Sequence, residues 1–124
     1  ATAPFVQQQD LLKGFELIQS QDLDYVFSAT NYSFPIQRAI KLDTDGKVSM
    51  FTPEHFNTRS QDLEEAWHDA GQFYWGKTSA WLGKSIIFST NSSIVSLPQF
   101  KVQDIDTPQD WQRAELIAKT LLGS

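Results

Sequence analysis

Two aspartates, Asp104 and Asp106, are the residues of this 124-residue chain whose spacing most directly suggests chemistry. They follow Val102 in an alternating stretch that predicts a strand, and side chains two residues apart on a strand share a face. Their Cα atoms would lie roughly 6.6 Å apart, so both carboxylates could reach one cation. Mg²⁺ is usually held by one or two carboxylates together with substrate phosphates, so the pair suggests phosphoryl or nucleotidyl transfer.

A helix is expected to begin directly after these aspartates. Thr107 is a suitable N-cap, Pro108 suits the first helical position, and Asp110 completes a variant of the capping box. Open α/β sheets bind ligands outside the carboxyl ends of their strands, which favours a functional site at this point. A purely structural alternative stays open, because acidic residues near a helix N-terminus are stabilised by the helix dipole whether or not they do chemistry.

Composition and charge restrict the class of protein. The length allows one domain with a hydrophobic core, to which 40% hydrophobic residues and four tryptophans contribute. A net charge of −5 without any cluster of Lys and Arg argues against nucleic acid as a partner. The chain has no cysteine, which excludes disulfides and thiolate metal sites. It also has no apolar stretch of membrane-spanning length, so we expect a soluble cytoplasmic protein with no membrane partner.

Helices and strands alternate along the chain, which favours an α/β sandwich. Periodicity predicts a helix over residues 5–19, in which Gly14 is a mild weakness, and a short acidic helix from residue 60. Residues 36–42 and 47–51 flank a Gly-containing turn and predict a β-hairpin that departs from the sandwich. The remaining predicted elements are strands over residues 23–28, 71–75, 86–89 and 94–97 and a helical turn over residues 78–82.

Other polar residues admit both a structural and a functional interpretation. Tyr74, His68 and Asp69 lie in an aromatic-rich stretch and could line a polar pocket. Arg59 stands alone in a polar loop, where a solvated surface charge and an anion clamp are both open. His55 and His68 lack the spacing of a metal-binding pair, so we do not expect them to share a metal.

Three stretches of the chain together resemble the acylneuraminate cytidylyltransferases, most closely the bacterial enzymes for pseudaminic acid. They are Ala-Thr-Ala-Pro at residues 1–4, His-Asp-Ala-Gly-Gln-Phe-Tyr-Trp-Gly at residues 68–76, and Val-Gln-Asp-Ile-Asp-Thr at residues 102–107. This family uses CTP, a nonulosonic (nine-carbon) sugar acid and Mg²⁺ to make a CMP-sugar and pyrophosphate. The resemblance therefore implies a nucleotidyltransferase whose product is used to modify flagellin or other surface glycans.

The resemblance also implies roles for individual residues. Asp104 and Asp106 fall on the paired aspartates that hold the catalytic Mg²⁺. Four residues fall on or near sugar-binding positions. Arg59 matches an arginine that helps bind the sugar acid, and Tyr74 lies near a sugar-contacting tyrosine. Gln37 stands where the sialic acid enzymes have a lysine that reaches across the dimer, and Phe88 lies near an aromatic pair that lines the sugar pocket.

The implied fold is part of a Rossmann-like nucleotidyltransferase sandwich with a β-hairpin dimerisation excursion. Residues 1–124 would form the C-terminal portion of a single cytidylyltransferase domain, and residues 36–60 would form the arm that pairs two chains. The Arg-, Gly-, Ser- and Lys-rich loop that cradles the CTP phosphates in this family has no counterpart in the sequence. We therefore expect a fragment that is inactive alone. The alternative is a catalytically silent module that binds a sugar acid or supplies a dimer interface.

Overall fold

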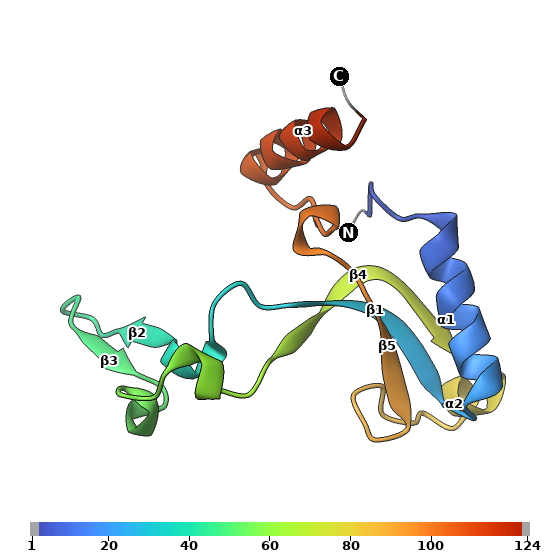
Figure 1. Cartoon of the computed structure of the whole chain (residues 1–124), viewed down its shortest axis with the longest axis horizontal. Coiled ribbons are helices and arrows are strands. Elements are labelled where there is room, and N and C mark those ends of the chain that lie inside the picture. The colour runs from blue at the N-terminus through green and yellow to red at the C-terminus, as the bar shows by residue number, and fades with distance from the viewer. Residues whose placement is uncertain (1–2, 123–124) are drawn as a thin grey trace. The chain divides into compact units, whose positions relative to one another are not determined.

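The structure is a computed structural model that describes residues 3–122. Its helices and strands, in chain order, are α1 (Gln8–Ser20), β1 (Tyr25–Asn31), β2 (Ile40–Leu42), β3 (Val48–Met50), β4 (Trp67–Gly76), α2 (Thr78–Leu82), β5 (Ser92–Ser96) and α3 (Pro108–Leu122) (Figure 1). The chain divides into two compact units. Ala1–Thr30 and Asp69–Ser124 form what we term the sheet unit, and Asn31–His68 form the hairpin unit.

The sheet unit contains a three-stranded sheet in the order β4-β1-β5. Strand β1 pairs in parallel with β5, with a register that runs from Tyr25 opposite Ser92 to Ala29 opposite Ser96. Strand β4 runs antiparallel to β1, since the amide of Lys77, just after β4, donates to the carbonyl of Asp24, just before β1. The mixed sheet and its helices confirm the predicted α/β class.

The core lies between the sheet and α1, which covers one face of it (Figure 1). Its buried members are the hydrophobic residues Ile18, Val26, Ala70, Phe73, Val95 and Leu97. Trp75 packs against α1, where its indole Nε1 donates to the carbonyl of Leu11 at 2.9 Å. A Cβ at Gly14 would lie 2.6 Å from Cδ1 of Trp75. The helix glycine that weakens the sequence pattern is therefore required by the close approach of this indole.

A bulge in β4 sets which of its side chains face the core. Gly71 has φ 70°, a left-handed conformation that glycine adopts without strain. The amides of Gln72 and Phe73 both donate to Oγ of Ser28 at 3.3 Å. Ala70 and Phe73 are both buried although they are three residues apart, so the alternation of faces shifts across the bulge. Tyr74 is thereby directed to the face opposite the core.

The hairpin unit contains the predicted hairpin. Strands β2 and β3 pair antiparallel, with Ile40 opposite Met50 and Leu42 opposite Val48. The turn between them is fixed by Asp43, whose Oδ1 accepts from the amides of residues 45 and 47 at 2.9 Å. The hairpin prediction is confirmed, because its turn chemistry is local to a few residues. Its strands are shorter than the predicted 36–42 and 47–51, and Ile36–Arg38 form a 3-10 turn instead.

Two predicted strands are wrong, and one predicted helix is shorter than expected. Residues 86–89 form an irregular loop after α2, with bends at 87–89, and residues 102–106 form no strand after the 3-10 turn Gln99–Lys101. An alternating or apolar sequence becomes a strand only where a neighbouring strand can pair with it. The acidic helix from residue 60 is a single 3-10 turn, Ser60–Asp62. Within residues 3–122, no helix combines the length and apolar character needed to cross a membrane.

Candidate functional site

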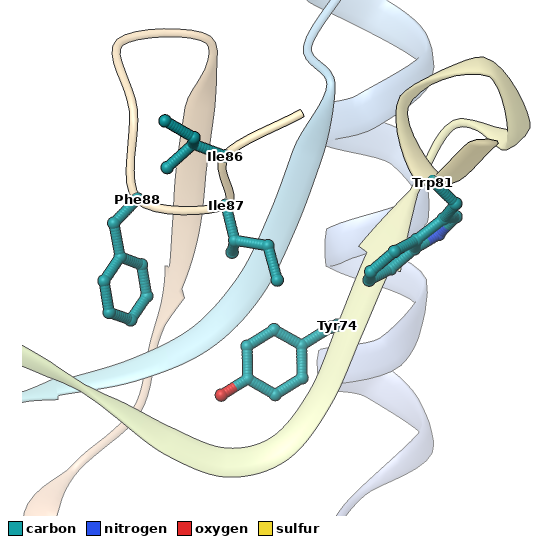
Figure 2. Close-up of a pocket in the computed structure, with 5 residues that line it drawn as sticks. All are labelled: Tyr74, Trp81, Ile86, Ile87 and Phe88. Carbon is teal, nitrogen blue, oxygen red and sulfur yellow. The ribbon is translucent and has the colours of Figure 1, made fainter. Parts of the chain in front are cut away.

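An apolar pocket of about 560 Å³ opens on the sheet unit. Its lining comes from β4, α2 and the loop that follows α2, as Figure 2 shows. The lining residues are Tyr74, Trp81, Ile86, Ile87 and Phe88. The structure therefore brings together Tyr74 and Phe88, two of the four residues that the sequence predicted to bind a sugar.

The ring of Phe27 in β1 contacts the rings of both Tyr74 and Phe88. It stacks on Tyr74 with centroids 5.5 Å apart, and it lies 5.4 Å from the ring of Phe88. Only 8% of Phe27 is exposed, so the rings of Tyr74 and Phe88 pack against a buried side chain of the sheet. Aromatic contacts of this kind hold flat side chains in place and pre-form a surface for a ligand.

Trp81 and the isoleucines of the pocket were missed by the sequence interpretation. The hydroxyl of Tyr25 donates to the carbonyl of Ser85 at 3.0 Å, and its ring meets Trp81 edge to face at 4.8 Å. These contacts fix both α2 and the loop that carries Ile86 and Ile87. The available signal is the apolar Ile-Ile-Phe run at residues 86–88, whose pattern also predicts a strand.

Tyr74, which lines the pocket, forms a hydrogen bond with a second side chain of β4. The hydroxyl of Tyr74 donates to Oδ2 of Asp69 at 2.5 Å. Burial, together with this hydrogen bond and the negative charge of Asp69, raises the pKa of Tyr74 to about 12. The hydroxyl therefore keeps its proton at neutral pH. Of the three residues expected to line a polar pocket, only Tyr74 lines this one, and the pocket is apolar. His68 packs on Tyr32 in the hairpin unit, with ring centroids 4.8 Å apart.

Asp104 and Asp106 lie in the segment that joins the 3-10 turn Gln99–Lys101 to α3. Both side chains are exposed, and Gln103 beside them is buried. The amide Nε2 of Gln103 donates to the carbonyl of Asp104 at 2.7 Å, and its Oε1 is buried without a hydrogen-bond partner. The segment thus buries Gln103 and presents the two carboxylates to solvent, although not from the strand that was predicted.

The helix start beyond the aspartates has the predicted capping arrangement. Oδ2 of Asp110 accepts from the amides of Asp106 and Thr107 at 3.0 and 3.1 Å, and Oγ1 of Thr107 accepts from the amide of Asp110 at 3.1 Å. The hydrogen bond from the backbone amide of Asp106 is the main cause that lowers the pKa of the Asp110 carboxyl below its ordinary value of 3.8. Because the pKa of Asp110 is lower in the folded state, its ionised carboxylate stabilises the folded chain fully above pH 3.8. This contribution is lost as the pH falls through the pKa of the folded state.

Replacing Thr107 with alanine is expected to destabilise α3 by about 1 kcal/mol, because the N-cap hydroxyl bond is lost. Amide hydrogen exchange in α3 measures this change. Thr120→Ala is the matched control, since Oγ1 of Thr120 donates to the carbonyl of Leu116 within the helix and caps nothing. Its exchange should stay the same or become slower, because alanine has the higher helix propensity. Equal protection in both variants would exclude a capping role for Thr107.

A metal at Asp104 and Asp106 would have two carboxylates from this segment. Within residues 3–122 there is no group of three or more His, Cys, Asp or Glu side chains that could hold a metal ion. Two hard oxygen donors suit Mg²⁺, which keeps several waters and takes further ligands from substrate phosphates. Oδ2 of Asp110 is used by the helix cap, and Asp110 forms no three-carboxylate group with Asp104 and Asp106 in the described part of the chain. The donor set therefore fits magnesium held jointly with a phosphate substrate.

The two other predicted sugar-binding residues belong to the hairpin unit. Nε of Arg59 forms an exposed ion pair with Oδ2 of Asp62 at 2.9 Å. Nε2 of Gln37 donates to the carbonyl of Glu64 at 3.0 Å, and its Oε1 is buried without a partner. Tyr74 and Phe88 belong to the sheet unit. The sugar-binding roles of all four residues stay predictions.

Searches against known proteins relate the chain to one group of enzymes. No protein-family model matches it. The pseudaminic acid cytidylyltransferase of Campylobacter jejuni subsp. jejuni serotype O:23/36 (strain 81-176) is 42% identical over 119 residues, which is 96% of this chain and 51% of that protein. The protein of the same name from serotype O:2 of that organism matches with the same identity and coverage.

A third relative carries two activities in its name. It is the pseudaminic acid cytidylyltransferase and UDP-2,4-diacetamido-2,4,6-trideoxy-beta-L-altropyranose hydrolase of Helicobacter pylori (strain ATCC 700392 / 26695). It is 40% identical over 101 residues, which is 81% of this chain and 19% of that protein. The chain therefore belongs to the pseudaminic acid cytidylyltransferase family, and it spans about half the length of the Campylobacter relatives it matches.

Proposed function

We propose that this chain forms the sugar-binding and metal-binding part of a cytidylyltransferase. The complete enzyme would join CTP to pseudaminic acid or a related nine-carbon sugar acid, giving the CMP-sugar and pyrophosphate. The observation that carries this proposal is the 42% identity over 119 residues to two enzymes named for that activity. The pocket supports it, because it unites Tyr74 and Phe88, which are 14 positions apart in the sequence.

The chemistry of the pocket suits such a sugar. The second activity named for the Helicobacter relative acts on a diacetamido-trideoxy sugar. Acetamido and deoxy groups present methyl groups where common sugars present hydroxyls. A wall of Trp81, Ile86, Ile87 and Phe88 would bury methyl groups favourably, at about 25 cal/mol for each Å² removed from water. We therefore assign the sugar acid, rather than the nucleotide phosphates, to this pocket.

In the proposed reaction, this chain mainly binds the metal ion and the sugar and orients the sugar. The anomeric hydroxyl of the sugar forms a bond to the α-phosphorus of CTP, the bond to the pyrophosphate breaks, and pyrophosphate departs. Asp104 and Asp106 would hold Mg²⁺, which when bound neutralises charge that builds on the phosphate oxygens. The aromatic pocket would hold the sugar in one orientation, so that its hydroxyl meets the phosphorus productively. No residue of the chain is assigned as the general base.

The complete enzyme is further proposed to be a homodimer. Its product would supply the transfer of the sugar to flagellin or another surface glycan. The alternative is a catalytically silent module that binds the sugar acid or supplies a dimer interface. The lack of a glycine-rich basic loop in the sequence favours this alternative for the chain in isolation. Phosphate groups are usually bound by backbone amides and basic side chains, and the net charge of −5 disfavours CTP further.

We predict that the purified chain alone makes no CMP-sugar from CTP, Mg²⁺ and pseudaminic acid. Activity should appear when the chain is fused to the half of the Campylobacter enzyme that it does not match. CMP-sugar is measured by chromatography and pyrophosphate by a coupled assay, and the fusion without added sugar is the control. Product formed by the isolated chain would contradict the proposal that this chain binds the sugar and the metal but needs the other half of the enzyme for CTP. A folded fusion that binds CTP but makes no product would contradict the proposed function.

A further inference from the structure

Asp69 does not line the apolar pocket itself, but its carboxylate is hydrogen-bonded to the hydroxyl of Tyr74, which does. Asp69 lies on β4 five residues before Tyr74, on the other side of the bulge at Gly71. Its Oδ2 accepts the hydroxyl proton of Tyr74 at 2.5 Å. The ring of Tyr74 also stacks on Phe27, so the side chain is held at both its face and its hydroxyl. Asp69 therefore positions one wall of the pocket.

The same hydrogen bond determines what Tyr74 offers to a ligand. A phenol has one proton to donate, and Tyr74 gives it to Asp69. The raised pKa of Tyr74 means that this proton stays on the hydroxyl at neutral pH. The hydroxyl oxygen can then only accept a hydrogen bond from a ligand, and the carboxylate beside it carries a negative charge. This pair suits a ligand N–H or O–H and opposes a ligand anion.

We propose that Asp69 is a specificity-determining residue of the pocket. It directs the neutral, methyl-bearing and hydrogen-bond-donating part of the sugar acid into the pocket and excludes the carboxylate of the same molecule. This inference rests on the proposed function, in which the pocket takes the sugar acid. It fixes the orientation of the sugar, because the carboxylate must be bound outside this pocket.

Two small probes of similar size test the charge preference directly. N-Methylacetamide is neutral and carries an N–H, whereas acetate carries the same methyl group next to a negative charge. Each is titrated into the isolated chain at constant ionic strength, and the shifts of the Trp81 indole and Tyr74 ring resonances are followed by NMR. We expect N-methylacetamide to bind roughly tenfold more tightly than acetate at this site, as a nearby unit charge would require.

Asp69→Asn tests whether Asp69 causes this preference. Asparagine can still accept the Tyr74 hydroxyl through its side-chain oxygen, so the wall stays in place while the charge is removed. The preference for N-methylacetamide should fall by about fivefold or more. Asp45→Asn in the hairpin turn removes the same charge elsewhere and should leave the preference unchanged. Tyr74→Phe keeps the Asp69 charge and should keep acetate disfavoured.

Equal binding of the two probes to the unaltered chain would overturn the inference. So would an unchanged preference in Asp69→Asn. The fusion with the Campylobacter half separates these failures from failure of the proposed function. There, Asp69→Asn should raise KM for the sugar acid and leave KM for CTP unchanged. If the fusion makes CMP-sugar and Asp69→Asn changes neither KM value, the proposed function is supported and the role of Asp69 is contradicted.

Discussion

Replacing Asp106 with alanine is expected to lower the turnover of the complete enzyme at least about a hundredfold. The loss exceeds the ten- to hundredfold effect that is usual for residues that only support a metal ligand. Asp106 is exposed, and its contact with the helix cap uses its backbone amide, so the fold should be little affected. Exposed substitutions of this kind usually change stability by less than about 0.5 kcal/mol. Turnover and stability should therefore separate clearly.

Two measurements test this role. In the fusion with the Campylobacter half, Mg²⁺-dependent pyrophosphate release is compared between Asp106→Ala, Asp104→Ala and the control Asp45→Ala. In the isolated chain, Mn²⁺ replaces Mg²⁺, and paramagnetic broadening of the amides of residues 103–107 reports metal binding without any turnover. We expect the broadening to weaken in both site variants and to persist in the control. Near-normal turnover in Asp106→Ala would remove the metal role of this residue.

Introducing aspartate at Leu42 is expected to break self-association of the chain. Ile40, Leu42 and Val48 lie on one face of the β2–β3 hairpin and are 56%, 68% and 61% exposed. A two-stranded hairpin is marginally stable in water unless its apolar face is covered. We propose that a second copy of the chain covers this face, as the predicted arm at residues 36–60 requires. Loss of one buried leucine corresponds to about 2–3 kcal/mol, or roughly a 30- to 150-fold weaker dimer.

Sedimentation velocity over a micromolar concentration range measures the effect. Ser49→Asp is the matched control, because residue 49 lies between Val48 and Met50 on the same strand and points to the opposite face. It introduces the same charge and the same unfavourable strand residue. We expect Leu42→Asp to sediment as a monomer and Ser49→Asp to sediment as the unaltered chain does. A monomeric unaltered chain with an ordered hairpin would rule out this arrangement.

The parts of the fold that were predicted correctly are encoded within a few neighbouring residues. The capping of α3 needs only Thr107 and Asp110, and the hairpin needs only the turn at residues 43–46 with apolar residues on each side. The buried β1 strand is recognisable from its unbroken run of non-charged residues. Local chemistry of this kind acts before and independently of tertiary contacts, so a sequence pattern reports it faithfully.

The pocket was only half predicted. The family resemblance implies sugar-binding roles for Tyr74 and Phe88 separately, without placing them in one pocket. Their union with Trp81 in one pocket depends on the bulge at Gly71, which shifts the facing of β4. A bulge changes the face of every following side chain, and its position is set by the partner strand. Sequence alternation in β4 therefore could not specify which ring would face outward.

The segment around Asp104 and Asp106 shows the same division. The sequence by itself determined that two carboxylates precede a capped helix, because residue type and capping need no distant partner. Only the tertiary structure determined that residues 102–106 form no strand and that Gln103 is buried, since a strand exists only beside a pairing neighbour. The sequence thus specified the chemical groups and their local order. Contacts between distant segments specified the backbone on which those groups stand.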